Sequence, residues 1–91
     1  MELKWTSRAL SDLARLHEFL APANKPAAAR AIQALTKAPT ILLTNPRIGE
    51  QLFQFDPREV RRILVGQYET RYEIQGGAIY VLSVWHTREN R

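Results

Sequence analysis

The residues best suited to chemistry form the end of the chain, from Trp85 to Arg91. This segment places an indole, an imidazole, two guanidiniums and a carboxylate directly after the apolar run 79–84. An imidazole can transfer protons near neutral pH, and a guanidinium can hold a phosphate or a carboxylate in a bidentate contact. Because the apolar run indicates a strand, we expect a rigid sheet to position these groups at its end.

Composition limits the chemistry that this segment can perform. Thirteen Lys and Arg residues oppose nine Asp and Glu, so the net charge of +4 favours acidic partners such as nucleic acid or an acidic protein. We do not favour direct nucleic-acid binding, since many basic domains bind none. The chain has no cysteine, and His17 and His86 lack the spacing of metal ligands, so we expect no disulfide, metal or cofactor.

Length and hydropathy bound the class of protein. The 91 residues predict a single domain over residues 1–91. No apolar run approaches the ~20 residues that a membrane span requires. The segment 1–4 lacks the basic-then-apolar order of a signal peptide. We therefore expect a cytoplasmic protein with no membrane contact.

Two amphipathic helices are expected in the first half. The first begins after Thr6 or Ser7, ends at Pro22 and carries its apolar residues on one side: Leu10, Leu13, Leu16, Phe19 and Leu20. The second begins near Asn24, and its apolar stripe comprises Ala28, Ile32, Leu35 and Leu42. Pro39 lacks the backbone N–H that a helix needs, so we expect a kink or break there.

After Gly49 the pattern alternates and indicates strands over residues 51–55, 60–65 and 68–74, followed by the run 79–84. Leu3 and Trp5 indicate a further short strand before the first helix. We predict an α+β fold with the order β-α-α-β-β-β, in which a helical hairpin packs on a small antiparallel sheet.

A hairpin at Gly76-Gly77 sets the register of the last two strands. It pairs Tyr68 with Trp85, which predicts Trp85 on the core face beneath the helices and His86 on the opposite face.

These elements and their motifs resemble the RelE/ParE superfamily, the bacterial toxins of type II toxin–antitoxin modules. The resemblance covers nearly the whole chain and depends on four segments: Pro46-Arg47-Ile48-Gly49, Arg58–Arg62, Tyr68–Ile74 and Trp85–Glu89. It implies a cognate ParD-like antitoxin and one of two activities. RelE-like members cut messenger RNA on the ribosome with basic residues and a terminal His or Tyr, whereas ParE-like members poison DNA gyrase.

Comparison residue by residue favours the ParE-like branch. The nuclease pattern expects an arginine three residues before Tyr72, where this chain has Glu69. The terminal His and Tyr of the nucleases fall near Thr87 and Arg88, and neither can act as a general base near neutral pH. The resemblance therefore implies inhibition of DNA gyrase through binding, with a ribosome-dependent messenger RNA endonuclease as the alternative. A non-toxic, partner-binding protein with the toxin fold is a second alternative.

Three interpretations of the closing segment stay open. In a nuclease, His86 would transfer protons, Glu59 would be a second acid–base group, and three arginines would hold the phosphate: Arg62, Arg71 and Arg88. In the interpretation that we favour, Trp85 anchors a target-binding surface with a polar rim formed by His86, Arg58, Arg61, Arg88, Glu89 and Arg91. In the third, Trp85 and His86 complete the core, and Arg88 pairs with Glu89 at the surface.

The resemblance also suggests where an antitoxin binds. Antitoxins of this family usually wrap an extended segment and a helix over their toxin. We expect that contact on the helical hairpin, at Leu42 and Leu43.

Overall fold

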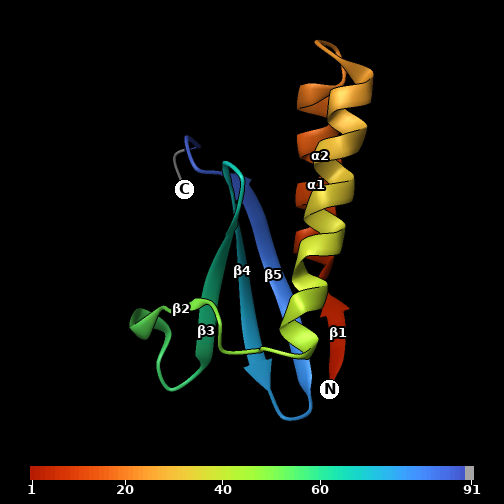
Figure 1. Ribbon diagram of the computed structural model, residues 1–91. Helices are drawn as coiled ribbons and strands as arrows, with labels where there is room; N and C mark the ends of the chain where they lie inside the picture. Colours follow the sequence, from red (N-terminus) through yellow and green to blue (C-terminus); the bar gives the residue numbers. More distant parts are fainter. Residues whose placement is uncertain (90–91) are drawn as a thin grey trace.

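The computed structural model describes residues 1–89, and Asn90 and Arg91 lie outside the described part. Within it, two helices lie against one face of a five-stranded sheet (Figure 1). The helices are α1 (Ser7–Leu20) and α2 (Lys25–Lys37), and the strands are β1 (Glu2–Trp5), β2 (Glu50–Gln51), β3 (Glu59–Val65), β4 (Tyr68–Gln75) and β5 (Ala78–His86). The predicted α+β class and element order are confirmed, with β2 as a short edge strand before three long ones.

Helix α1 begins where the sequence predicts, because Thr6 Oγ1 accepts a hydrogen bond from Ala9 N at 3.1 Å. Its buried face is narrower than the predicted stripe and consists of Ala9, Asp12, Leu13 and Leu16. Leu10 and Phe19 belong to the predicted stripe but are exposed, and Phe19 is 79% exposed. Successive residues of an α-helix are turned by about 100°, so Leu10, one residue after Ala9, and Phe19, three after Leu16, lie on opposite flanks of the buried face rather than at its centre.

Helix α2 is capped by Asn24, whose side chain accepts a hydrogen bond from Ala27 N at 3.0 Å. It ends at Lys37, two residues before Pro39, and the chain continues as the 3-10 helix η1, Ala38–Leu43. The break expected at Pro39 is therefore confirmed.

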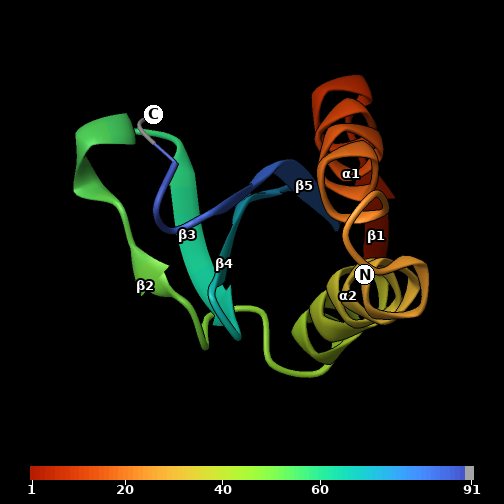
Figure 2. The same ribbon diagram turned by 90° about the horizontal axis from the view of Figure 1, so that it is seen from above.

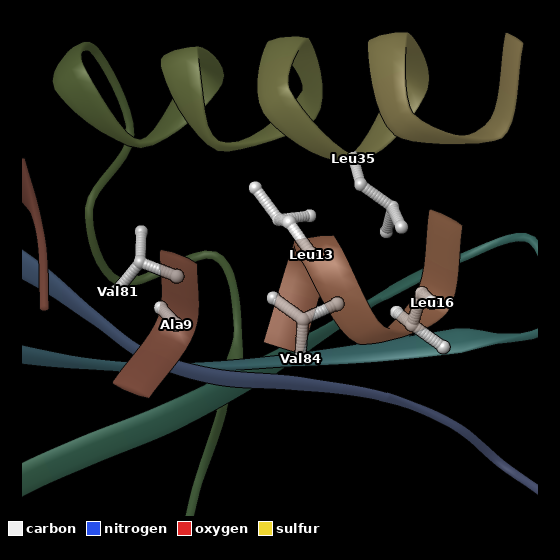
Figure 3. Close-up of a cluster of buried hydrophobic side chains, with 6 residues drawn as sticks. All are labelled: Ala9, Leu13, Leu16, Leu35, Val81 and Val84. Carbon is white, nitrogen blue, oxygen red and sulfur yellow. The ribbon is translucent and has the colours of Figure 1, made fainter. Parts of the chain in front are cut away.

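The core lies between the helices and the middle of the sheet. Figure 3 shows its largest cluster, in which both helices meet β5 through Ala9, Leu13, Leu16, Leu35, Val81 and Val84. A second cluster lies beneath η1 and contains Leu42, Tyr72, Ile74 and Ile79. Burial of apolar surface at ~25 cal/mol per Å² holds the hairpin on the sheet. The two clusters thus fix the helices over β5 and anchor η1 beside them.

The sheet is mixed, whereas the sequence predicts an antiparallel one. Its strand order is β1-β5-β4-β3-β2, and β1 runs parallel to β5, with Glu2 opposite Ala78. The expected strand over residues 51–55 is also wrong. After the two-residue β2 the chain forms a 3-10 turn, η2 (Phe53–Phe55). The ring of Phe55 in this turn lies against the guanidinium of Arg71.

A bulge in β5 overturns the predicted face of Trp85. Tyr72 pairs with Val81 as expected, but Arg71 pairs with Ser83, which leaves Leu82 without a partner on β4. Beyond this point the register moves by one residue, so Trp85 lies opposite Glu69 and His86 opposite Tyr68. Because alternate residues face opposite sides, Trp85 lies on the open face and His86 on the helix side.

Helix α1 and its cap support the bulge. Thr6 Oγ1 donates to the carbonyls of Val81 and Leu82 at 3.0 and 3.1 Å. The buried carboxylate of Asp12 accepts a hydrogen bond from Val84 N at 3.0 Å. These contacts satisfy backbone groups that an irregular strand would leave unpaired. The irregularity is therefore stabilised from the helical layer.

Candidate functional site

Residues 85–89 of the closing segment do not form one cluster, because the bulge sends Trp85 and His86 to opposite faces. On the open face the guanidinium of Arg71 lies between two rings, 4.8 Å from the centroid of Trp85 and 5.0 Å from that of Phe55. Stacking of this kind is a favourable cation–π arrangement. Trp85 itself is only 8% exposed, so the stack presents mainly Arg71 and Phe55 outward.

The arginines of the open face are paired with acids of the same chain. Arg58 donates two hydrogen bonds to Glu73, at 3.1 and 2.7 Å, and these bonds raise the pKa of Arg58. Arg62 bonds Glu50 at 2.7 Å and Glu69 at 2.9 Å, and these partners raise its pKa. Each guanidinium keeps its charge, but a carboxylate occupies the geometry that a phosphate would use.

His86 lies on the helix side, near the end of α1. Its ring meets Tyr68 edge to face, with centroids 5.2 Å apart. Both ring nitrogens are engaged: Nε2 contacts Gln67 Oε1 at 3.1 Å, and Nδ1 accepts a hydrogen bond from Arg88 N at 3.1 Å. These contacts give the imidazole a structural role at the strand end.

A cleft of about 610 Å³ lies beside His86, lined by Arg15, Leu16, Phe19, Leu20, Tyr68, Arg88 and Glu89. Glu89 there bonds Arg15 at 2.7 Å and the backbone N–H of His86 at 3.0 Å.

The residues of the nuclease hypothesis are not brought together. His86 is on the helix side, whereas Arg62 and Arg71 project from the open face. Glu59 accepts hydrogen bonds from Arg47 and Arg61, and the bonds from Arg47 hold its pKa below the ordinary value. A carboxylate held in this ionised state is a poor proton donor. Arg88 is exposed and bonds His86 through its backbone.

The predicted target-binding residues are also divided. Trp85 and Arg58 share the open face, while His86 and Arg88 lie at the other side of the strand end, and Glu89 borders both sides. The side chain of Arg61 is only 14% exposed and points inward to Gly49 O, at 2.8 Å. Arg91 lies outside the described residues.

An apolar groove between α2 and β3 is a feature that the sequence did not reveal. It has a volume of about 780 Å³ and is lined by Ala34, Lys37, Ala38, Thr40, Ile41, Ile48, Gly49, Glu50 and Arg62–Val65. Of the two leucines expected at the antitoxin contact, Leu42 is fully buried in the core and Leu43 is 41% exposed. Exposed Ile41 and Ile48, apolar residues outside the predicted stripes and strands, were the available sequence signal.

The groove continues onto an open strand edge. In the described part of the chain, strand β2 pairs with β3 at Arg61 and Arg62 alone. Within residues 1–89, no strand covers the same edge at 63–65, so backbone groups there are exposed to pairing with another chain.

Two further properties bear on the kind of site. Among residues 1–89, no three His, Asp or Glu side chains are grouped so that they could hold a metal ion. Neither helix of the described chain combines the length and the apolar character that crossing a bilayer requires.

The fold defines a small α+β protein in which a helical hairpin packs on a mixed sheet. The same architecture occurs in a solved structure described as the chromosomal ParDE TA system from P. aeruginosa. That chain has a TM-score of 0.80 and 22% sequence identity, and the match covers 94% of this chain and 95% of the other. A comparison with curated proteins gives no match.

The chain belongs to the ParE toxin family of the type II toxin–antitoxin system parDE, whose family model matches residues 3–91. The predicted membership of the ParE-like branch is thereby confirmed.

Proposed function

We propose that this chain, as one toxin domain over residues 1–91, is a cytoplasmic toxin that inhibits DNA gyrase. We further propose that a cognate ParD-like antitoxin neutralises the toxin by occupying the groove between α2 and β3. The observation that carries the antitoxin proposal is the groove itself, an apolar channel beside an unpaired strand edge in a member of the ParE family.

The arrangement of layers supports a helical occupant. Helix α1 packs on β5 and α2 packs beside α1, so both helices gather over the β1–β5 end of the sheet (Figure 2). The β3–β2 end projects beyond them, and Ile63 and Val65 on its helix side are only half-buried. An amphipathic helix laid beside α2 would cover these side chains, and an extended segment could pair with the free edge of β3.

Charge supports an acidic occupant. Helix α2 carries three bases and no acid, and within residues 1–89 no ion pair includes Lys25, Arg30 or Lys37. Elsewhere in residues 1–89 nine bases face nine acids, so the excess positive charge of this part of the chain lies on α2. Lys37 lines the groove, and Arg30 lies two turns away on the same side. A partner with an apolar face and acidic flanking residues would match this surface.

Gyrase inhibition through binding is supported by family membership and by the separation of the acid–base groups from the arginines. Purified toxin should stop DNA supercoiling by gyrase, and the protein encoded by the neighbouring antitoxin frame should restore it. In a sensitive host, expression should give filamentous cells and a DNA-damage response. Rapid loss of translation with codon-positioned cuts in messenger RNA would favour the endonuclease instead. Normal growth would indicate a toxin fold that only binds a partner.

A further inference from the structure

The outer wall of the groove is the segment 46–50, and one buried hydroxyl holds it. Tyr72 Oη donates a hydrogen bond to Pro46 O at 2.7 Å and accepts one from Gly49 N at 3.1 Å. The ring of Tyr72 is fully buried in the cluster beneath η1. Tyr72 therefore connects the core directly to the backbone of the wall.

The wall lies so close to the sheet that only glycine fits at its centre. A Cβ atom on Gly49 would lie 2.5 Å from Arg62 O and 2.6 Å from Tyr72 Oη. On the outer side, Arg61 donates to Gly49 O at 2.8 Å, and Glu59 joins Arg61 to Arg47. The backbone of the wall is thus bonded from the core and from the surface.

We infer that Tyr72 is a positioning residue for partner binding, whose hydroxyl holds residues 46–50 in place as the groove wall before a partner arrives. The inference builds on the proposed antitoxin groove. Ile48 and Glu50 line the groove, and their positions follow from the two bonds to Pro46 and Gly49. A pre-formed wall spares the partner the entropy of ordering it. If the wall can open, the apparent Kd equals the Kd of the closed form divided by the fraction of molecules in which the wall is closed.

The test compares Tyr72→Phe with Tyr80→Phe. Both changes remove one hydroxyl, but the Tyr72 hydroxyl makes two hydrogen bonds, whereas the Tyr80 hydroxyl makes none within residues 1–89. The probe is the protein encoded by the antitoxin frame beside this chain's gene. Loss of two buried hydrogen bonds should weaken its binding to Tyr72→Phe by about tenfold or more, while Tyr80→Phe should bind like the wild type.

Hydrogen exchange separates positioning from general destabilisation. In free Tyr72→Phe, amides 48–51 should exchange faster while core amides of α1 and β5 keep their protection. The closed fraction obtained from those rates should predict the measured rise in Kd, and binding should restore protection. A general loss of stability would instead increase exchange in the core as well. Equal affinity despite an open wall, or weaker binding with the wall still closed, would overturn the inference.

A second pair of variants keeps the test valid if Tyr72→Phe does not fold. Gly49→Ala leaves the Tyr72 hydroxyl in the chain but should push the wall away from Arg62 O and Tyr72 Oη by steric contact, whereas Gly77→Ala meets no atom within 4 Å. Gly49→Ala should then reproduce the weaker binding, and Gly77→Ala should not. Failure of the wild-type chain to bind the antitoxin would reject the proposed function itself. Wild-type binding with unchanged affinity in both test variants would reject only the role of Tyr72.

Discussion

At the residue scale, Glu59 joins Arg47 of the groove wall to Arg61 of β3. It accepts hydrogen bonds at 2.9 Å from Nε and Nη2 of Arg47 and from Nε of Arg61. The bonds from Arg47 are the main cause of its lowered pKa. The folded chain therefore binds this proton less tightly than the unfolded chain does, and the difference makes stability depend on pH.

We predict that Glu59→Gln lowers the free energy of unfolding by about 1 kcal/mol at neutral pH. In the wild type this contribution should be fully present above the ordinary pKa of 4.5 and should be lost as pH falls through the lowered pKa of folded Glu59. Urea unfolding between pH 3 and 8 on the wild type and the variant measures both effects, with pH values in steps of about one unit. Plotted against pH, the free energies of unfolding of the wild type and of Glu59→Gln should converge at low pH.

Glu18→Gln serves as the matched control, because Glu18 is exposed and has no ion pair among residues 1–89. It should leave stability at neutral pH nearly unchanged. If the free energies of unfolding of wild type and Glu59→Gln differed by the same amount at every pH, the carboxylate charge would have no part in the effect.

His86→Ala should retain growth inhibition. The imidazole is engaged by Gln67 and by the Arg88 backbone, and it lies on the face opposite Arg62 and Arg71. Its loss should lower the free energy of unfolding by about 1 kcal/mol through the lost contacts with Tyr68 and Gln67. Growth assays and thermal melts of the variant test this. Loss of toxicity in a folded variant that still binds antitoxin would instead give His86 a direct role in toxicity, and cleavage of messenger RNA by the wild type but not by the variant would identify that role as proton transfer.

At this scale the sequence predicts the composition of the closing segment but not its orientation. The face of Trp85 and His86 depends on the bulge at Leu82, and the bulge depends on Thr6 and Asp12, more than 70 residues earlier. Asp12, an acid directly before Leu13 of the apolar stripe of α1, was the available sequence signal of that contact. Such a tertiary hydrogen bond overrides the local alternation on which register arguments rest.

At the element scale, α2 forms the side of the groove opposite β3. It also carries the basic side chains beside the groove. We predict that Lys37→Glu weakens antitoxin binding by about tenfold at low salt, because it places a like charge against an acidic partner. The loss should shrink as ionic strength rises. Titrations at two salt concentrations measure it. Lys25→Glu makes the same change of charge at the beginning of α2, where the side chain does not line the groove.

If Lys25→Glu and Lys37→Glu weaken binding equally, overall charge rather than the groove controls the affinity. An increase in affinity for Lys37→Glu would show that the partner presents bases to this surface.

The helices and strands were largely predictable from the sequence, but the pairing of β1 and the end of β2 were not. Caps at Thr6 and Asn24 and the break before Pro39 follow from local chemistry, and each occurs where the sequence indicates. The parallel pairing of β1 and the early end of β2 depend on contacts across the sheet. The groove exists because β2 ends early and the helices gather at the other end, so no single segment of sequence encodes it.

At the scale of the whole molecule, two surfaces suited to partners lie on opposite sides of the sheet. The groove lies on the helix side, bounded by α2 and β3. The open face carries the Trp85–Arg71–Phe55 stack, with Arg58 at its border. If the antitoxin uses the groove and the target uses the open face, a variant on one side should leave the other activity intact.

Two substitutions test this separation. Ala34→Trp adds bulk at an exposed position that lines the groove, so it should reduce neutralisation by antitoxin while toxicity persists. Arg58→Gln removes the charge from the border of the open face, keeps a donor for Glu73, and should reduce gyrase inhibition while antitoxin affinity stays within about twofold. Ala29→Trp, also exposed on α2 but outside the groove, controls for the added bulk.

Binding and supercoiling assays on the same preparations measure both effects, and thermal melts establish that each variant is folded. Parallel loss of both activities in either folded variant would mean that antitoxin and gyrase compete for one surface.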